Sequence, residues 1–158
     1  MGSGYPLAGV VGRTAILDLP QVGTMSSTHS ANPLACVAGL ATIEEIETRD
    51  LVRTALDKGE TLLRALHELQ ERHPDRIEWC FGKGLVAAIL FRRTNNGVSA
   101  SEFASRVAER CMQKGVLVVH TGRESIKLGP PLTIPEEALL EGVTVLDEAI
   151  GDVAAGQA

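Results

Sequence analysis

Hydrophobic residues recur at helical spacing in two consecutive stretches of this chain. In residues 33–48 apolar positions return at about every third or fourth residue and alanine is frequent, which predicts a mostly buried helix. From Asp50 to about His73 leucines and charged residues share that spacing, which predicts an amphipathic helix that ends before Pro74. We therefore expect two successive helices, the second with one face toward a core and the other toward water.

Short β-prone runs follow these helices. Residues 77–81 and 85–91 flank the turn Gly82-Lys83-Gly84, which predicts an antiparallel hairpin. Residues 116–119 and 125–128 predict two further strands.

Two more helices are interleaved with these strands. Ser99 or Ser101 begins one that ends at Lys114, before Gly115, and an acidic first turn at residues 136–137 begins a last helix. The order strand, strand, helix, strand, strand, helix predicts an α+β arrangement: a small antiparallel sheet with helices on one face.

The start of the chain is rich in glycine. Residues 7–12 form an apolar run that predicts a buried strand, and residues 13–19 predict a short helical turn. The sequence Gly2-Ser3-Gly4 is only a weak match to a phosphate loop, because no Gly-Lys-Ser or Gly-Lys-Thr follows it, and it suits either a close approach of the backbone to a bulky group or a tight turn. Since a flexible loop leads directly into a predicted core strand, we expect further sequence upstream of Met1.

Size and composition narrow the class of protein. A chain of 158 residues with 44% hydrophobic and 22% charged residues suits one globular domain, or one domain plus part of another. The 3% aromatic content, the net charge of -5 and the lack of a basic cluster argue against nucleic acid as a partner. No apolar stretch reaches the roughly 20 residues of a membrane span and no signal peptide is evident, so we expect a cytoplasmic protein without a membrane partner.

Cysteines and carboxylates suggest no reactive centre. Cys36, Cys80 and Cys111 are far apart and form no Cys-x-x-Cys pair, which predicts neither a disulfide framework nor a metal site. Each stands in an apolar run, which favours a buried thiol over a nucleophile. The acidic pairs lie on predicted helix exteriors, so we assign them no catalytic role.

The junction at residues 28–33, Thr-His-Ser-Ala-Asn-Pro, is the first candidate site. A helix start has unpaired N–H groups and a partial positive charge, so the Thr28 hydroxyl and the Asn32 amide there suit an anion such as a phosphate. The simpler interpretation is that Asn32 is an N-cap with Pro33 at the first helical position. Spacing alone favours the cap.

Lysine chemistry is the second candidate. The chain has only four lysines, and Lys127 lies in a predicted strand between Ile126 and Leu128, where it can point into a site and form a Schiff base with a carbonyl compound. An edge-strand charge facing water is the alternative.

Three segments, taken together, point to a family. Residues 2–13, with the glycine loop and Tyr5-Pro6-Leu7-Ala8-Gly9, residues 28–36, and the stretch Leu128-Gly129-Pro130-Pro131-Leu132-Thr133-Ile134 resemble class III aminotransferases, which depend on pyridoxal phosphate (PLP). The segments occur in the family's order and at about its spacing, over essentially the whole chain.

The resemblance implies a fold type I enzyme, α/β to α+β, of which this chain is the C-terminal portion. Residues 1–48 would be the end of the large cofactor-binding domain and the start of a linking helix. Residues 49–158 would be the small domain, an antiparallel sheet covered by helices. The family is normally a homodimer with active sites at the subunit interface, so we expect a homodimer for the parent.

The resemblance also implies site residues. Thr28 matches the threonine that binds the cofactor phosphate, and Tyr5 lines the entrance. Lys127 stands where many members have an arginine that receives a substrate carboxylate, and Arg123 is a nearby alternative. The family's Schiff-base lysine falls just upstream of Met1, so the chain itself has no catalytic residue and we expect it to be inactive.

Two functions follow as hypotheses. The parent protein would be a PLP-dependent aminotransferase that moves an amino group from an amino donor to a 2-oxo acid. The alternative is a non-catalytic α+β module for assembly or ligand sensing. A lysine encoded just before the present start favours the enzyme, and a genuine start codon at Met1 favours the module.

Overall fold

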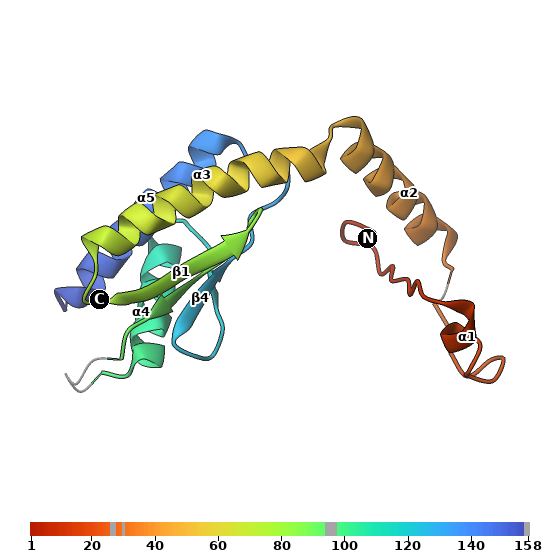
Figure 1. Ribbon diagram of the computed structural model, residues 1–158, viewed down its shortest axis with the longest axis horizontal. Coiled ribbons are helices and arrows are strands. Elements are labelled where there is room, and N and C mark those ends of the chain that lie inside the picture. The colour runs from red at the N-terminus through yellow and green to blue at the C-terminus, as the bar shows by residue number, and fades with distance from the viewer. Residues whose placement is uncertain (26–27, 30, 94–97, 157–158) are drawn as a thin grey trace. The chain divides into compact units, whose positions relative to one another are not determined.

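The chain folds as two compact units (Figure 1). The computed structural model describes residues 1–25, 28–29, 31–93 and 98–156. The units are Met1–Leu51 and Val52–Ala158. The predicted division after residue 48 lies close to this boundary, and the assignment of the two parts to a large and a small domain stays a prediction.

The first unit contains the helices α1 (Thr14–Leu17) and α2 (Pro33–Thr48). α1 confirms the predicted helical turn, and α2 has the predicted bounds. The predicted strand at residues 7–12 is wrong: these residues have no strand to pair with among the described part of the unit, and Val11 is fully exposed. Leu7 packs instead against α2, where a side chain on Gly39 would meet Leu7 Cδ2 at 2.3 Å.

The predicted burial of α2 is also wrong. Of its residues only Ala35 and Gly39 are buried, whereas Leu34, Val37 and Leu40 are each more than 60% exposed. The apolar pattern correctly indicates a helix, but nothing within the described chain covers that surface.

The second unit is an antiparallel sheet with three helices. Its elements are α3 (Leu51–Arg72, which begins at the boundary), β1 (Ile77–Lys83), β2 (Val86–Phe91), α4 (Ala100–Gln113), β3 (Val119–His120), β4 (Ser125–Leu128) and α5 (Glu136–Ala154). The strand order is β1-β2-β4-β3, and every neighbouring pair is antiparallel. The predicted hairpin and α+β order are confirmed.

One strand is shorter than predicted. The sequence predicts a strand over residues 116–119, but pairing with β4 begins only at Val119. The Val116 N–H donates to the carbonyl of Cys111 at 2.9 Å, and Gly115 has a φ of +91°, so the backbone here still terminates α4.

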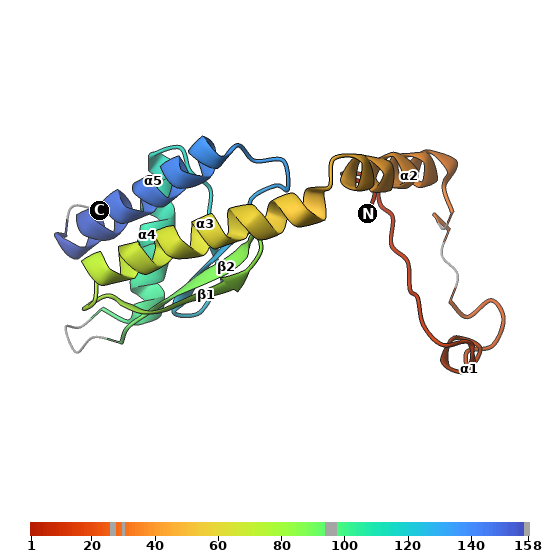
Figure 2. The same cartoon turned by 45° about the horizontal axis from the view of Figure 1, so that its top comes forward.

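All three helices lie on one face of the sheet (Figure 2). Side chains that alternate along the strands form the core with leucines of α3 and with both other helices. Phe91 of β2 meets Phe103 of α4 edge-to-face, with ring centroids 5.2 Å apart. We call this helix-covered side the inner face and the opposite side the outer face.

α3 covers the edge strand β1. The Gln70 side chain donates to the Glu78 carbonyl at 2.9 Å, and His67 Nε2 lies 3.4 Å from the Cys80 carbonyl. At the other end of β1, a Cβ on Gly59 would lie 2.4 Å from Gly84 Cα, so helix and turn approach backbone to backbone. This contact is possible because neither Gly59 nor Gly84 has a side chain.

Ion pairs join α4 to α5. Arg110 Nε lies 2.8 Å from Asp152 Oδ2, and Lys114 Nζ lies 2.8 Å from Glu148 Oε2 and 3.3 Å from Asp152 Oδ2. Hydrogen bonds from Arg110 and then Lys114 lower the pKa of Asp152, and the hydrogen bond to Glu148 raises the pKa of Lys114.

These shifts predict a pH dependence of unfolding. Since the folded-state pKa of Asp152 is lowered, its contribution is complete above its unfolded pKa of about 4 and is lost as pH falls through the folded value. Lys114 has a raised pKa, so its contribution is lost only as pH rises through that value in strong alkali. We expect Asp152→Asn to flatten the acid decline of the urea midpoint, while Glu109→Gln, an exposed α4 carboxyl, leaves it intact. Equal slopes for the two variants would contradict this role of Asp152.

Candidate functional site

The start of α2 is capped by its own sequence. The Asn32 side-chain oxygen accepts from the N–H of Leu34 at 3.0 Å and of Ala35 at 3.4 Å, while its carbonyl accepts from Cys36 at 2.9 Å. Pro33 has no N–H. The N-cap interpretation of Asn32 is therefore confirmed, and the first donors of the helix are already used.

This geometry changes how an anion would bind at the junction. Thr28 and His29 lie in an exposed turn, and Ala31 has a φ of +54°. Because the cap occupies the α2 amides, a phosphate would depend on the Thr28 hydroxyl, on loop N–H groups and on the helix dipole. The assignment of Thr28 to the cofactor phosphate stays a prediction.

Removing the cap gives a local test. We expect Asn32→Ala to raise the hydrogen exchange rates of the Leu34 and Ala35 amides roughly fivefold, the equivalent of about 1 kcal/mol. Asn32→Ser keeps a side-chain acceptor and should change the rates little. Identical exchange in both variants would show that another group satisfies these amides.

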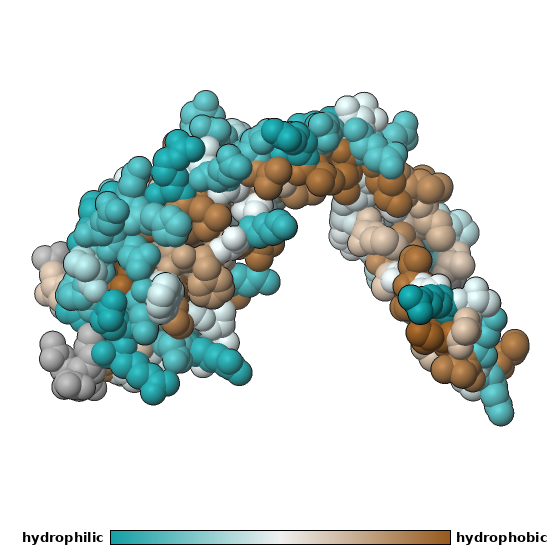
Figure 3. Space-filling view, viewed as in Figure 1, coloured by the Kyte–Doolittle hydropathy of each residue, from teal (hydrophilic) through white to brown (hydrophobic). Residues whose placement is uncertain are grey.

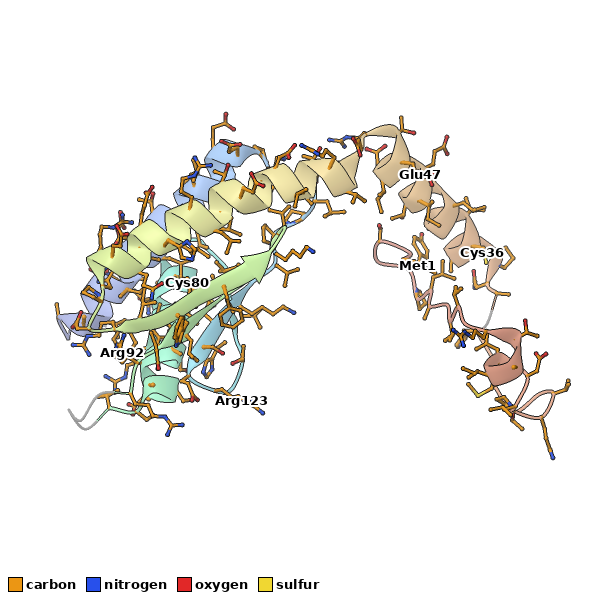
Figure 4. The ribbon with its side chains drawn as sticks, viewed as in Figure 1. Met1, Cys36, Glu47, Cys80, Arg92 and Arg123 are labelled. Carbon is orange, nitrogen blue, oxygen red and sulfur yellow. The ribbon has the colours of Figure 1, made fainter. Side chains whose placement is uncertain are left out.

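The glycine loop is a tight turn. Ser3 and Gly4 have φ values of +44° and +108°, and the Tyr5 N–H donates to the Gly2 carbonyl at 3.0 Å. The Ser3 hydroxyl lies 3.0 Å from that of Thr42 on α2. Tyr5 is 54% exposed, so its ring is free to line an entrance, as the resemblance predicts for it. Figure 4 shows Met1 on the loop and Cys36 on α2 in this unit.

Lys127 lies on the outer face of the sheet. It pairs with Ala88 of β2 on one side and with Val119 of β3 on the other, and it is exposed. No hydrogen bond or ion pair of its ammonium group is present within the described ranges. Both interpretations of Lys127, a carboxylate partner and a charge facing water, are compatible with this position.

Arg123 occupies a different place from Lys127. It lies at the turn between β3 and β4 (Figure 4), where its carbonyl is 3.0 Å from His120 Nε2. Lys127 lies in β4 itself, beyond the strand's first residue. The two cations are therefore separate candidates for a substrate carboxylate.

A cavity that no local sequence pattern predicts lies beside this strand. A space of about 400 Å³ lies between residues 115–119, residues 127–131 and one side of α5, where Ala138 and Gly142 leave room. Its lining is apolar except for Lys127. Because the Lys127 side chain leaves the sheet on the outer face and α5 covers the inner face, the space itself suits an apolar group.

Two further lysines have partners, and two of the three cysteines are buried as predicted, whereas Cys36 is only partly buried. Lys58 donates to the Ile134 carbonyl, and Lys114 is held by its ion pairs. Burial raises the pKa of both Cys80 and Cys111 to about 11, as expected for structural thiols. Within the described residues no cluster of three potential metal ligands occurs, and no helix there is long and apolar enough to cross a membrane.

The chain is similar to known proteins over nearly its whole length. The family model described as "Aminotransferase class-III" matches residues 1–150. The chain is 34% identical to 4-aminobutyrate aminotransferase of Mycobacterium leprae, over 96% of the chain and 34% of that protein. It is 36% identical to leucine/methionine racemase of Thermococcus litoralis, over 99% of the chain and 35% of that protein.

A solved structure agrees with this match. The amine transaminase of an uncultivated Pseudomonas species, in its PLP-bound form, is 30% identical and superimposes with a TM-score of 0.73, over 82% of the chain and 30% of that structure. The chain thus spans about a third of the length of the relatives it matches.

Proposed function

The chain belongs to the class III aminotransferase family, whose cofactor is PLP, and on that premise we propose that it is the C-terminal part of a PLP-dependent transaminase. The parent transfers an amino group from an amino donor to a 2-oxo acid in the cytoplasm, as a homodimer. The family match from Met1 to residue 150, over only a third of each relative, carries this proposal.

In this proposal the chain supplies binding groups. PLP, when bound, serves as an electron sink for the substrate carbon. The Thr28 hydroxyl donates to the cofactor phosphate, Tyr5 lines the entrance, and Lys127 or Arg123 receives a substrate carboxylate. The Schiff-base lysine lies upstream of Met1.

The experiment that tests the proposal is to identify the natural N-terminus. Mass spectrometry of the protein from its source organism should give a chain about three times as long, with a lysine just before the present Met1. A natural chain that begins at Met1 would contradict the proposed enzyme function and favour a non-catalytic α+β module.

The Thr28 assignment has its own test in the parent protein. A hydrogen bond to a charged group contributes about 1.5–3 kcal/mol, so Thr28→Ala should weaken PLP binding roughly tenfold to a hundredfold. Thr28→Ser keeps the hydroxyl and should retain most of the affinity. The measurement is the amount of PLP that stays bound after dialysis, determined from its absorbance. If Thr28→Ala retains as much PLP as Thr28→Ser, the Thr28 hydroxyl does not bind the phosphate.

Racemisation is the second candidate, because one relative carries the name leucine/methionine racemase. Racemisation needs no 2-oxo acid acceptor, whereas transamination does. Loss of optical activity from L-leucine without an acceptor would favour the racemase, and strict dependence on an acceptor would favour the transaminase.

A further inference from the structure

The outer face of the sheet is apolar around one cation. The register places Phe81 of β1 opposite Ala88 of β2. Lys127 of β4 lies between Ala88 and Val119 of β3. This row across all four strands is therefore apolar except for the Lys127 ammonium group, which has no ion-pair partner among the described residues.

The residues around this row are exposed. The exposed fractions are 61% for Trp79, 58% for Phe81, 58% for Val119 and 57% for Val86. Figure 3 shows brown and tan side chains gathered over the strands, with teal side chains around them. An apolar patch of this kind on a sheet is typical of a surface that another surface covers.

The second unit does not cover this face with its own helices. α3, α4 and α5 all pack on the inner face of the sheet (Figure 2). In the proposed parent about two thirds of the protein precede Met1, because the chain matches only about a third of each relative. This upstream part is large enough to supply a covering surface.

The proposed role of Lys127 decides between this upstream part and a separate protein. Lys127 receives the carboxylate of a substrate whose amino group reacts at PLP, and the lysine that holds PLP lies upstream of Met1. The two ends of a small substrate are a few bonds apart, so the upstream part must approach the outer face at Lys127. A separate protein on this face would fill the space that the substrate needs.

A surface that approaches Lys127 also reaches the neighbouring strands. Strands in a sheet are about 4.8 Å apart, so Phe81 is about 10 Å from Lys127 along the row. Contacts between domains of one chain bury roughly 300 Å² or more on each side, a patch about 17 Å or more across. Because Ala88 is small, the aromatic side chains of β1 stand above the strand that separates them from Lys127 and meet such a surface first.

We propose, on the basis of the proposed function, that the outer face is a contact surface for the part of the parent that precedes Met1. Trp79 and Phe81 are its main apolar contacts. Lys127 keeps its role, because the substrate carboxylate supplies the negative charge opposite its ammonium group. Without that carboxylate a closed contact would bury an uncompensated charge, so the space above Lys127 stays open to water until the substrate binds.

A photo-reactive side chain on this face identifies what covers it. In the parent, Phe81→p-benzoylphenylalanine should cross-link on irradiation to a peptide from upstream of Met1, which mass spectrometry after proteolysis identifies. The matched control is Met112→p-benzoylphenylalanine, because Met112 is 56% exposed but lies on α4, which packs on the inner face. We expect at least ten times more upstream cross-links from position 81 than from position 112. If the Phe81 variant fails to fold, Val86 of the same face carries the probe.

Other cross-links would overturn the proposal. A peptide of residues 1–158 would make this chain or a second copy the cover, and a peptide of another protein would assign the face to that protein. Equal yields of upstream cross-links from positions 81 and 112 would also contradict the contact.

The transaminase activity of the same preparation separates this contact from the proposed function. An active parent whose position 81 cross-links elsewhere contradicts the contact surface alone. A natural chain that begins at Met1 contradicts the proposed function and the contact together.

Discussion

The 158-residue chain mixed with PLP will transfer amino groups no faster than free PLP at the same concentration. All four lysines lie in the second unit, and none is both buried and unpaired. A Schiff-base lysine requires an ammonium group whose pKa is lowered by desolvation or by a neighbouring cation. None of the four lysines is buried, so the structure provides no desolvated ammonium group.

Trapping with borohydride measures this directly. After reduction and proteolysis, we expect pyridoxyl groups scattered at low yield over exposed lysines, with no site approaching one per chain. Lys58→Arg removes a lysine held by a backbone carbonyl and should leave the pattern unchanged. A stoichiometric adduct on Lys127 would instead place the essential lysine within this chain and refute the upstream assignment.

Gly59→Ala will destabilise the second unit by about 2–3 kcal/mol, the typical cost of overpacking a close contact. The new Cβ would stand 2.4 Å from Gly84 Cα and 2.5 Å from its carbonyl carbon and oxygen. These are backbone atoms of a tight turn in which Gly84 has a φ of +55°, so they cannot yield as a flexible side chain does. The higher helix propensity of alanine, up to about 1 kcal/mol, offsets only part of the cost.

The matched control is Gly151→Ala on α5. A Cβ there meets nothing within 4 Å, so alanine should be neutral or stabilise by up to about 1 kcal/mol. Urea unfolding followed by circular dichroism compares the two variants. Similar midpoints would show that α3 and the β1–β2 turn do not approach as closely as described.

Local signals in the sequence predicted the elements well. The bounds of α2 and β4 are those predicted. Asn32 and Pro33 mark the start of α2, and a short run with apolar residues marks β4. The structure also decides between two predicted caps: Ser99 accepts from the Glu102 N–H at 3.1 Å, so α4 begins after Ser99 and not after Ser101. Caps and turns depend on residues that lie a few positions apart, so they can be predicted from the sequence.

Burial was harder to predict, because it depends on distant partners. Apolar residues at helical spacing occur in both helices, but Leu62, Leu66 and Leu69 of α3 are buried, whereas Leu34 and Leu40 of α2 are exposed. Residues 7–12 have strand composition, but a strand also needs a neighbour to pair with. Composition indicates which residues favour burial and not what covers them.

The candidate site was predictable only in part. The position of Lys127 in a strand followed from its apolar neighbours Ile126 and Leu128, but its place at the centre of a row from β1 to β3 depends on register. The cavity beside it depends on the small residues Ala138 and Gly142 of a helix that follows in the chain. Neither feature leaves a local pattern in the sequence.

The side chains of His67 and Gln70 on β1 affect how the protein behaves at high concentration. A β-strand from another molecule can extend a sheet only where carbonyl and amide groups await a partner. On β1 the carbonyls of Glu78 and Cys80 already face α3 side chains. Fibril growth by strand addition is therefore disfavoured at this edge. The double substitution Gln70→Ala and His67→Ala would leave the two β1 carbonyls free to pair with a strand of another molecule.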